Sequence, residues 1–139
     1  MKINFYDLGT VGDNELLYAV IITQYKDKWV FVKHKERDTW EIPGGHHEKN
    51  ESIEDAASRE LYEETGAIKF KISPICIYSV DRDGSESFGQ LFYAEVEAFD
   101  VLPGYEIGEI KFWDCLPDKL TYSLIQPILF NKGKEFLKL

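Results

Sequence analysis

The segment GHHEKNESIEDAASRELYEETGA, residues 45–67, holds most of the information on how this chain folds. Ser52 is a good helix N-cap, and Asp55, three residues later, resembles the partner residue of a capping box. Gly66 is a typical residue for ending a helix, because glycine adopts the left-handed conformation without a steric penalty. The segment therefore predicts a helix over residues 52–65 that follows a glycine-containing loop.

Apolar residues and carboxylates share one face of this predicted helix. With about 100° of rotation per residue, the face that would meet the rest of the protein contains Ile53, Ala56, Ala57 and Leu61. Glu60 and Glu64 fall within the same face, one turn apart, and Glu63 lies at its edge. A helix that packs on this face would therefore bring carboxylates to the body of the protein.

Carboxylates that crowd on the packed face of a helix need a nearby positive charge, because they repel one another and lose hydration. A divalent cation supplies that charge, and an all-oxygen ligand set favours Mg²⁺ or Mn²⁺ over zinc. The alternative is a solvated acidic face, which is the usual explanation of a run of charges. The preceding Pro43-Gly44-Gly45 favours the cation, since glycines let the backbone approach a ligand closely.

The rest of the chain reads as strands followed by a second helix. Strands are predicted over residues 16–25, 29–35, 68–80, 88–96 and 107–113, with a short extended piece at 40–42. The first two are expected to form a hairpin, Asp83-Gly84 marks another turn, and residues 43–45 are expected to break regular structure. A helix is predicted from Thr121 onward, with Pro127 in its first turn or at a kink. This pattern indicates an α/β domain whose sheet is covered on both faces.

Length, charge and cysteine content limit the classes of protein to which this chain can belong. The 139 residues suit one domain, taken as 1–139, and a net charge of -9 argues against general coating of nucleic acid. Cys76 and Cys115 lack metal-ligand spacing, which favours idle thiols in a reducing cytoplasm. The first residues do not resemble a signal peptide, and no segment approaches the length of a membrane span. A cytoplasmic location is therefore expected.

The register of the quoted segment resembles the Nudix box of the Nudix hydrolase family. Each fixed position of that box is filled, by Gly45, Glu51, Arg59, Glu60, Glu63, Glu64 and Gly66. Ala67 stands where the family usually has a larger aliphatic residue, and Asn50 where many members have glycine. The resemblance implies an α/β/α sandwich, with a mixed β-sheet between a catalytic helix and a C-terminal helix. It also implies a MutT-like enzyme built from a single small domain.

The resemblance implies roles for the residues of the box. Gly45, Glu60, Glu63 and Glu64 would hold the metal, with Mg²⁺ expected and Mn²⁺ possible. Arg59 would orient a neighbouring carboxylate. The family reaction is the attack of water on phosphorus in a nucleoside diphosphate derivative. The general base is left open between Glu63, Glu106 and Glu109.

The sequence indicates less about the identity of the substrate than about the type of reaction. Lys33, Lys35, Arg37 and His46 are candidates to bind phosphates, although basic residues there also suit an ordinary surface. A nucleoside triphosphate or an oxidised nucleotide is the first expectation, and Gln126 could supply an amide for a base. The alternative is a non-catalytic nucleotide-binding or regulatory module on the same fold. No stable nucleic-acid complex and no membrane are expected, and the protein is expected to be a monomer or a homodimer.

Overall fold

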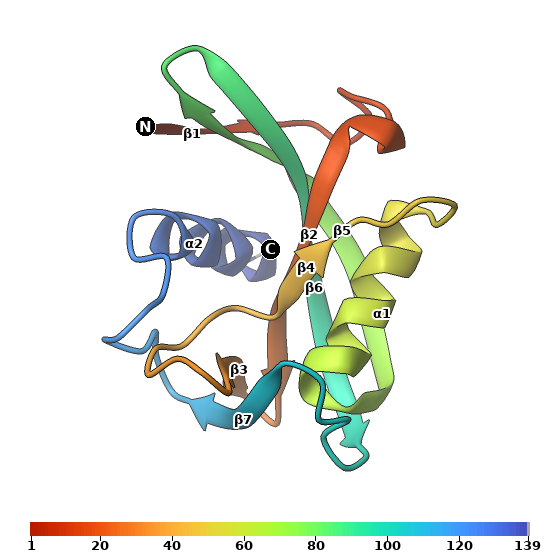
Figure 1. The fold of residues 1–139 in the computed structure, drawn as a ribbon, viewed down its shortest axis with the longest axis vertical. Coiled ribbons are helices and arrows are strands. Elements are labelled where there is room, and N and C mark those ends of the chain that lie inside the picture. Colours follow the sequence, from red (N-terminus) through yellow and green to blue (C-terminus); the bar gives the residue numbers. More distant parts are fainter. Residues whose placement is uncertain (139) are drawn as a thin grey trace.

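The computed structural model describes residues 1–138 of the chain, arranged as one twisted sheet with a helix on either side (Figure 1). Its elements in chain order are β1 (Lys2–Tyr6), the 3-10 turn η1 (Asp13–Glu15), β2 (Leu16–Tyr25), β3 (Lys28–His34), β4 (Gly44–His46), α1 (Ile53–Thr65), β5 (Ala67–Arg82), β6 (Ser85–Phe99), β7 (Ile107–Trp113) and α2 (Gln126–Leu137).

The sheet is mixed, as the sequence predicts. Its strand order is β1-β5-β6-β2-β3-β7, and β4 pairs with β2 beside this path. The central β2–β6 pair is parallel, whereas β1–β5, β5–β6, β2–β3, β2–β4 and β3–β7 are antiparallel. Figure 1 shows α1 and α2 on opposite sides of this sheet with β4 between them. The predicted α/β/α arrangement is therefore confirmed.

The glycine pair before α1 forms a strand, contrary to the expectation that residues 43–45 break regular structure. Gly44 and Gly45 pair with Val20 and Ala19 of β2 in the short strand β4. A Cβ atom on Gly44 would lie 2.4 Å from the carbonyl oxygen of Ala19, so only glycine allows this approach. The two glycines therefore bring the backbone of β4 directly against β2, at the start of the segment that leads to α1.

The two expected hairpins, β2–β3 and β5–β6, differ in the length over which their strands pair. β2 and β3 pair only at Gln24↔Trp29 and Tyr25↔Lys28, after which β3 pairs with β7. The Asp83-Gly84 turn is present, and both residues have positive φ angles (55° and 87°), as a tight hairpin requires. β5 continues through Pro74, with a register irregularity between Pro74 and Cys76. Sequence reasoning did not find β1, which adds to the sheet edge beside β5.

Helix α1 begins and ends as the sequence predicts, whereas α2 begins later than the predicted start at Thr121. The Ser52 hydroxyl accepts a hydrogen bond from the Asp55 backbone N–H at 3.0 Å, and Gly66 ends α1 in the left-handed conformation. α2 begins at Gln126 with Pro127 in its first turn, so this proline does not produce a kink. Within residues 1–138, no helix is long and apolar enough to cross a membrane.

Each helix covers its own apolar cluster. The cluster under α1 contains Leu16, Ala19, Ile21, Ile53, Ala56, Ala57, Leu61, Ala67, Ile77, Phe92, Ala94 and Val96. The cluster under α2 contains Ile22, Phe31, Ile42, Cys76, Tyr78, Val80, Leu91, Leu129 and Phe130. Complete burial of one large side chain in such a cluster contributes about 2 kcal/mol. The packed α1 face is the predicted one, so the helix carries Glu60 and Glu64 toward the sheet.

Candidate active site

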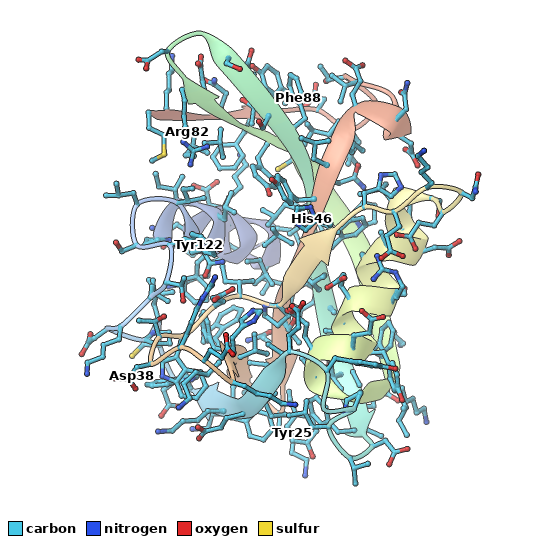
Figure 2. All side chains as sticks on the ribbon, viewed as in Figure 1. Tyr25, Asp38, His46, Arg82, Phe88 and Tyr122 are labelled. Carbon is cyan, nitrogen blue, oxygen red and sulfur yellow. The ribbon has the colours of Figure 1, made fainter. Side chains whose placement is uncertain are left out.

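A cavity of about 690 Å³ lies along β4. Its wall is formed by residues from α1, the start of α2, the β5–β6 hairpin and the segment before β7. Three of the lining residues, His46, Arg82 and Tyr122, come from separate parts of the chain and are labelled in Figure 2. Residues far apart in sequence therefore meet here, around the carboxylates of α1.

Glu64 is a buried carboxylate of the cavity, with only 8% of the residue exposed. Its Oε1 atom accepts a hydrogen bond from the backbone N–H of Gly44 at 2.9 Å. Burial raises the pKa of Glu64 to about 8, more than the Gly44 hydrogen bond lowers it, and neighbouring carboxylates raise it further. The structure therefore holds an acid that resists ionisation unless a positive charge is nearby.

Glu60 lies directly against Gly45. A Cβ atom on Gly45 would be 2.1 Å from Oε2 of Glu60, so the absence of a side chain makes room for this carboxylate. Burial is also the main cause that raises the pKa of Glu60. The two glycines and the two glutamates therefore lie together in one part of the cavity wall.

Arg59 connects the carboxylates of the box. Its Nε and Nη2 atoms donate to the two oxygens of Glu51 at 3.0 and 2.8 Å, and Nη2 also donates to the carbonyl of His46 at 2.9 Å. Its Nη1 atom donates to Glu60 at 2.8 Å and to Glu63 at 3.2 Å. These hydrogen bonds lower the pKa of Glu51 to about 2. Arg59 therefore orients three carboxylates and joins α1 to β4.

His47 fixes the loop between β4 and α1. Its Nδ1 atom lies 2.9 Å from the carbonyl oxygen of Leu16 and its Nε2 atom 2.6 Å from that of Glu51. Both neighbours are acceptors only, so both ring nitrogens can donate only when the imidazole is protonated. Burial lowers the pKa of His47, but these two hydrogen bonds outweigh it and raise the pKa overall.

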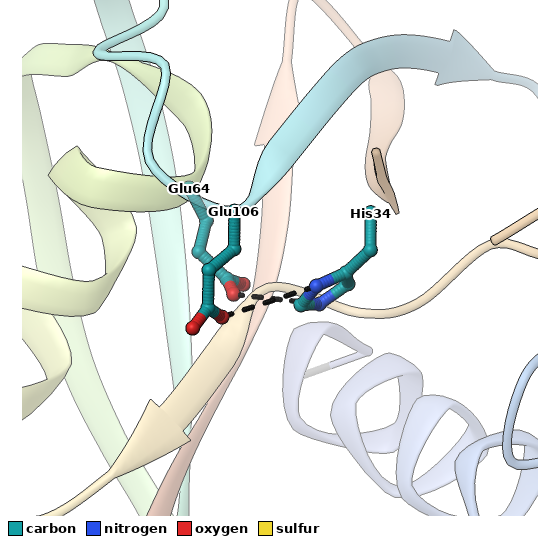
Figure 3. Close-up of side chains that lie close together, drawn as sticks. All are labelled: His34, Glu64 and Glu106. Carbon is teal, nitrogen blue, oxygen red and sulfur yellow. Dashed lines mark ion pairs between the residues drawn. The ribbon is translucent and has the colours of Figure 1, made fainter. Parts of the chain in front are cut away.

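A histidine faces Glu64 and a second glutamate, Glu106, which lies beside Glu64 (Figure 3). His34 Nε2 lies 3.9 Å from Glu64 Oε2, and His34 Nδ1 lies 3.9 Å from Glu106 Oε2. His34 Nε2 is also 3.4 Å from Oε1 of the buried Glu41. Their sequence positions carry no spacing signal, because His34, Glu64 and Glu106 come from β3, α1 and the segment before β7.

Two of the four basic residues predicted to bind phosphate line the cavity. Arg37 does so while its Nη1 atom donates to Glu41 at 2.7 Å, and its guanidinium lies 5.9 Å from the ring of Tyr122. His46 lines it as well, with its ring 4.9 Å from that of Tyr18. Both residues therefore belong to the cavity wall.

The other expected site residues lie elsewhere. Lys33 pairs with Glu109 at 3.4 Å, and Lys35 donates to a backbone carbonyl at 2.6 Å. Among the described residues that line the cavity, Glu106 is present but Lys33, Lys35 and Glu109 are not. Strand β7 explains the difference between the glutamates, because Glu109 lies opposite Lys33 within the β3–β7 ladder, whereas Glu106 precedes the strand.

The donor atoms of this site suit a hard divalent cation. The carboxylates of Glu60, Glu63 and Glu64 and the carbonyl of Gly45 offer only oxygen, and all four residues line the cavity. The buried Glu64 and the half-buried Glu60 are also acids whose pKa values are raised by desolvation. A bound cation would replace their lost hydration, so the residues present fit such an ion.

Comparison with known proteins identifies the class to which this fold and cavity belong. The NUDIX domain family matches residues 15–123. A Bacillus subtilis (strain 168) protein named "Putative 8-oxo-dGTP diphosphatase YtkD" is 30% identical over 126 residues, covering 83% of this chain and 78% of that protein. A second protein of that strain, "Putative 8-oxo-dGTP diphosphatase", is 43% identical over 94 residues, covering 67% of this chain and 62% of its own length.

A solved structure agrees on the fold. The crystal structure of the Bacillus subtilis pyrophosphohydrolase BsRppH superposes with a TM-score of 0.80 at 23% identity, covering 96% of this chain and 90% of that chain. The chain belongs to the Nudix family. It is a Nudix hydrolase of the pyrophosphohydrolase type, an enzyme that acts on nucleoside diphosphate derivatives.

Proposed function

We propose that this enzyme hydrolyses the diphosphate linkage of a nucleoside triphosphate or an oxidised nucleotide, with Mg²⁺ as its preferred cation. The observation that carries the proposal is the position of Glu64, a buried carboxylate held by Gly44 beside Glu60 in a cavity of about 690 Å³. Such an arrangement costs stability in the absence of a cation and is therefore best explained by binding one.

The metal ligands proposed are Gly45, Glu60, Glu63 and Glu64, with Mn²⁺ as a possible substitute. Bound there, the cation would neutralise charge on the diphosphate and lower the pKa of a coordinated water. Arg59 holds the carboxylates of Glu60 and Glu63 in place through the hydrogen bonds described above. Its role is to orient acids that would otherwise repel one another.

The proton of the attacking water needs an acceptor within the cavity. Glu63 and Glu106 both line it, and we propose one of them as the general base in place of Glu109. Glu106 is the more independent candidate, because Glu63 is already engaged by Arg59 at 3.2 Å. His34 lies 3.9 Å from Glu106 in the same cavity.

The substrate is proposed from the other residues that line the cavity. Arg37 offers positive charge and His46 offers its ring nitrogens to phosphate oxygens. Gln126 is buried, and its Oε1 atom accepts a hydrogen bond from the N–H of Ile42 at 2.9 Å, which fixes the direction of the amide. The amide NH₂ of Gln126 can then donate to a carbonyl of a base. The names of the two Bacillus relatives support an oxidised guanine nucleotide as the first candidate.

A panel of nucleotides tests the proposal directly. The purified chain with Mg²⁺ is incubated with canonical and oxidised nucleoside triphosphates, nucleotide sugars and dinucleoside polyphosphates, and products are measured by mass. Release of a nucleoside monophosphate from a triphosphate is expected, with 8-oxo-dGTP among the best substrates. Tight nucleotide binding without turnover across the whole panel would contradict the proposal and favour a non-catalytic module on the same fold.

A cytoplasmic location is proposed on chemical grounds alone. Cys76 and Cys115 are free thiols, one buried and one exposed. Thiols of this kind persist where the surroundings are reducing.

A further inference from the structure

The segment between β6 and β7 brings two residues to the cavity, Tyr105 and Glu106. The Glu106 side chain is 77% exposed, so packing around the side chain does little to hold it. Its position over the cavity therefore depends on how the backbone of residues 100–106 is fixed.

Lys35, just after β3, fixes the end of this segment at three points. Its Nζ atom donates to the carbonyl oxygen of Gly104 at 2.6 Å, and its backbone N–H donates to that of Glu106 at 2.9 Å. Gly108 packs against it so closely that a Cβ atom there would lie 3.2 Å from the Cα atom of Lys35. The register of the β3–β7 ladder shifts at this place, which is the mark of a bulge that redirects the neighbouring residues.

The beginning of the segment is fixed at the end of the catalytic helix. The backbone N–H of Asp100 donates to the carbonyl of Gly66 at 2.8 Å. Between the two anchors the chain turns at Gly104, which has a φ angle of 85°. The segment is therefore a strap from the C-terminus of α1 to Lys35, with Glu106 next to its second anchor.

We propose that Lys35 is a positioning residue that holds Glu106 over the cavity, and that it does not bind phosphate. Its ammonium group is directed to Gly104, and Lys35 is absent from the described residues that line the cavity. Glu106, by contrast, faces His34 at 3.9 Å inside the site (Figure 3). This inference rests on the proposed function, because the effect of Lys35 on turnover would pass through the role given to Glu106.

Kinetics of Lys35→Met test the inference, with Lys28→Met as the matched control. Lys28 is an exposed lysine at the opposite end of β3 from Lys35, where it pairs with Asp114. We expect Lys35→Met to lower kcat about tenfold with KM within about twofold, since a small misplacement of a catalytic group slows the chemical step. The double variant Lys35→Met/Glu106→Gln should be no slower than Glu106→Gln alone. Lys35→Arg, which keeps the donor, should restore most of the activity.

Hydrogen exchange provides a readout that does not depend on catalysis. Amides of residues 101–106 should exchange faster in Lys35→Met than in the wild type or in Lys28→Met. A raised KM at constant kcat, additive losses in the double variant, or unchanged exchange would each overturn the inference. If the wild type hydrolyses no nucleotide, the proposed function fails, whereas the exchange experiment still decides whether Lys35 holds the strap.

Discussion

Replacing Glu64 with glutamine should stabilise the metal-free protein while it abolishes turnover. Glu64 has an ordinary pKa of 4.5 when unfolded and about 8 in the fold, because it is buried. A pKa raised by folding gives stability that is complete below pH 4.5 and is lost as pH rises to about 8. Glutamine keeps an oxygen for the Gly44 N–H and never ionises, so it avoids this loss.

The size of the effect follows from the shift in pKa. At 1.36 kcal/mol per unit, the rise from 4.5 to about 8 corresponds to about 5 kcal/mol at pH 8 and above, and to about 3 kcal/mol at pH 7. For a domain of this size, the difference at pH 7 equals roughly 10 °C in Tm. Mg²⁺ at 100 times its Kd should cancel most of the difference at pH 7, since the wild type gains about 3 kcal/mol and the variant gains little.

Urea unfolding in EDTA, repeated from pH 5 to pH 9, measures this difference. Glu63→Gln is the control, because its carboxylate is on the same turn of α1 but its side chain is 34% exposed. The advantage of Glu64→Gln should grow with pH, whereas Glu63→Gln should differ from wild type by less than about 1 kcal/mol throughout. A Glu64→Gln advantage that does not change with pH, or a destabilised variant at pH 8, would refute the reasoning from burial.

Three further outcomes are expected. Glu106→Gln should lower kcat by about 100-fold if it is the base, whereas Glu109→Gln should stay within about twofold of wild type in the same steady-state assay. Gly45→Ala should displace the carboxylate of Glu60, 2.1 Å from the new methyl group, and weaken Mg²⁺ binding measured by calorimetry at least tenfold. His47→Gln should be less stable than the wild type, and most so below pH 6.5, because folding favours the imidazolium form of His47. The difference should shrink as pH rises through the raised pKa of His47. Urea midpoints across pH 5–9 check this.

Local sequence signals predicted the helix that carries the site. Ser52 and Gly66 bounded α1, and the periodicity of its apolar residues placed Glu60 and Glu64 on the packed face. These predictions succeeded because capping and helical periodicity depend on residues within a few positions of one another. The family resemblance added the sandwich architecture, which the comparisons and the strand order support.

The same local signals could not predict contacts between residues that are far apart in the sequence. The strand β4 forms because Gly44 and Gly45 meet β2, and a Gly-Gly pair by itself reads as a break. Lys35 looks like a phosphate ligand from its charge, but its partner, the carbonyl of Gly104, lies 69 residues away. His34 and Glu106 face each other only because β3 and β7 are neighbours in the sheet. Such contacts are set by topology, which the local pattern does not determine.

The parallel pairing at the centre of the sheet has a consequence for how the chain is made. β2 pairs with β6, whose first paired residue, Phe88, lies opposite Leu16. During synthesis, about seventy residues must therefore follow the start of β2 before the start of its neighbour β6 leaves the ribosome. A similar number of residues separates β1 from its partner residues in β5. Contacts this distant in sequence form slowly, so the nascent chain passes through a stage in which α1 has emerged while β2 still lacks its central neighbour β6.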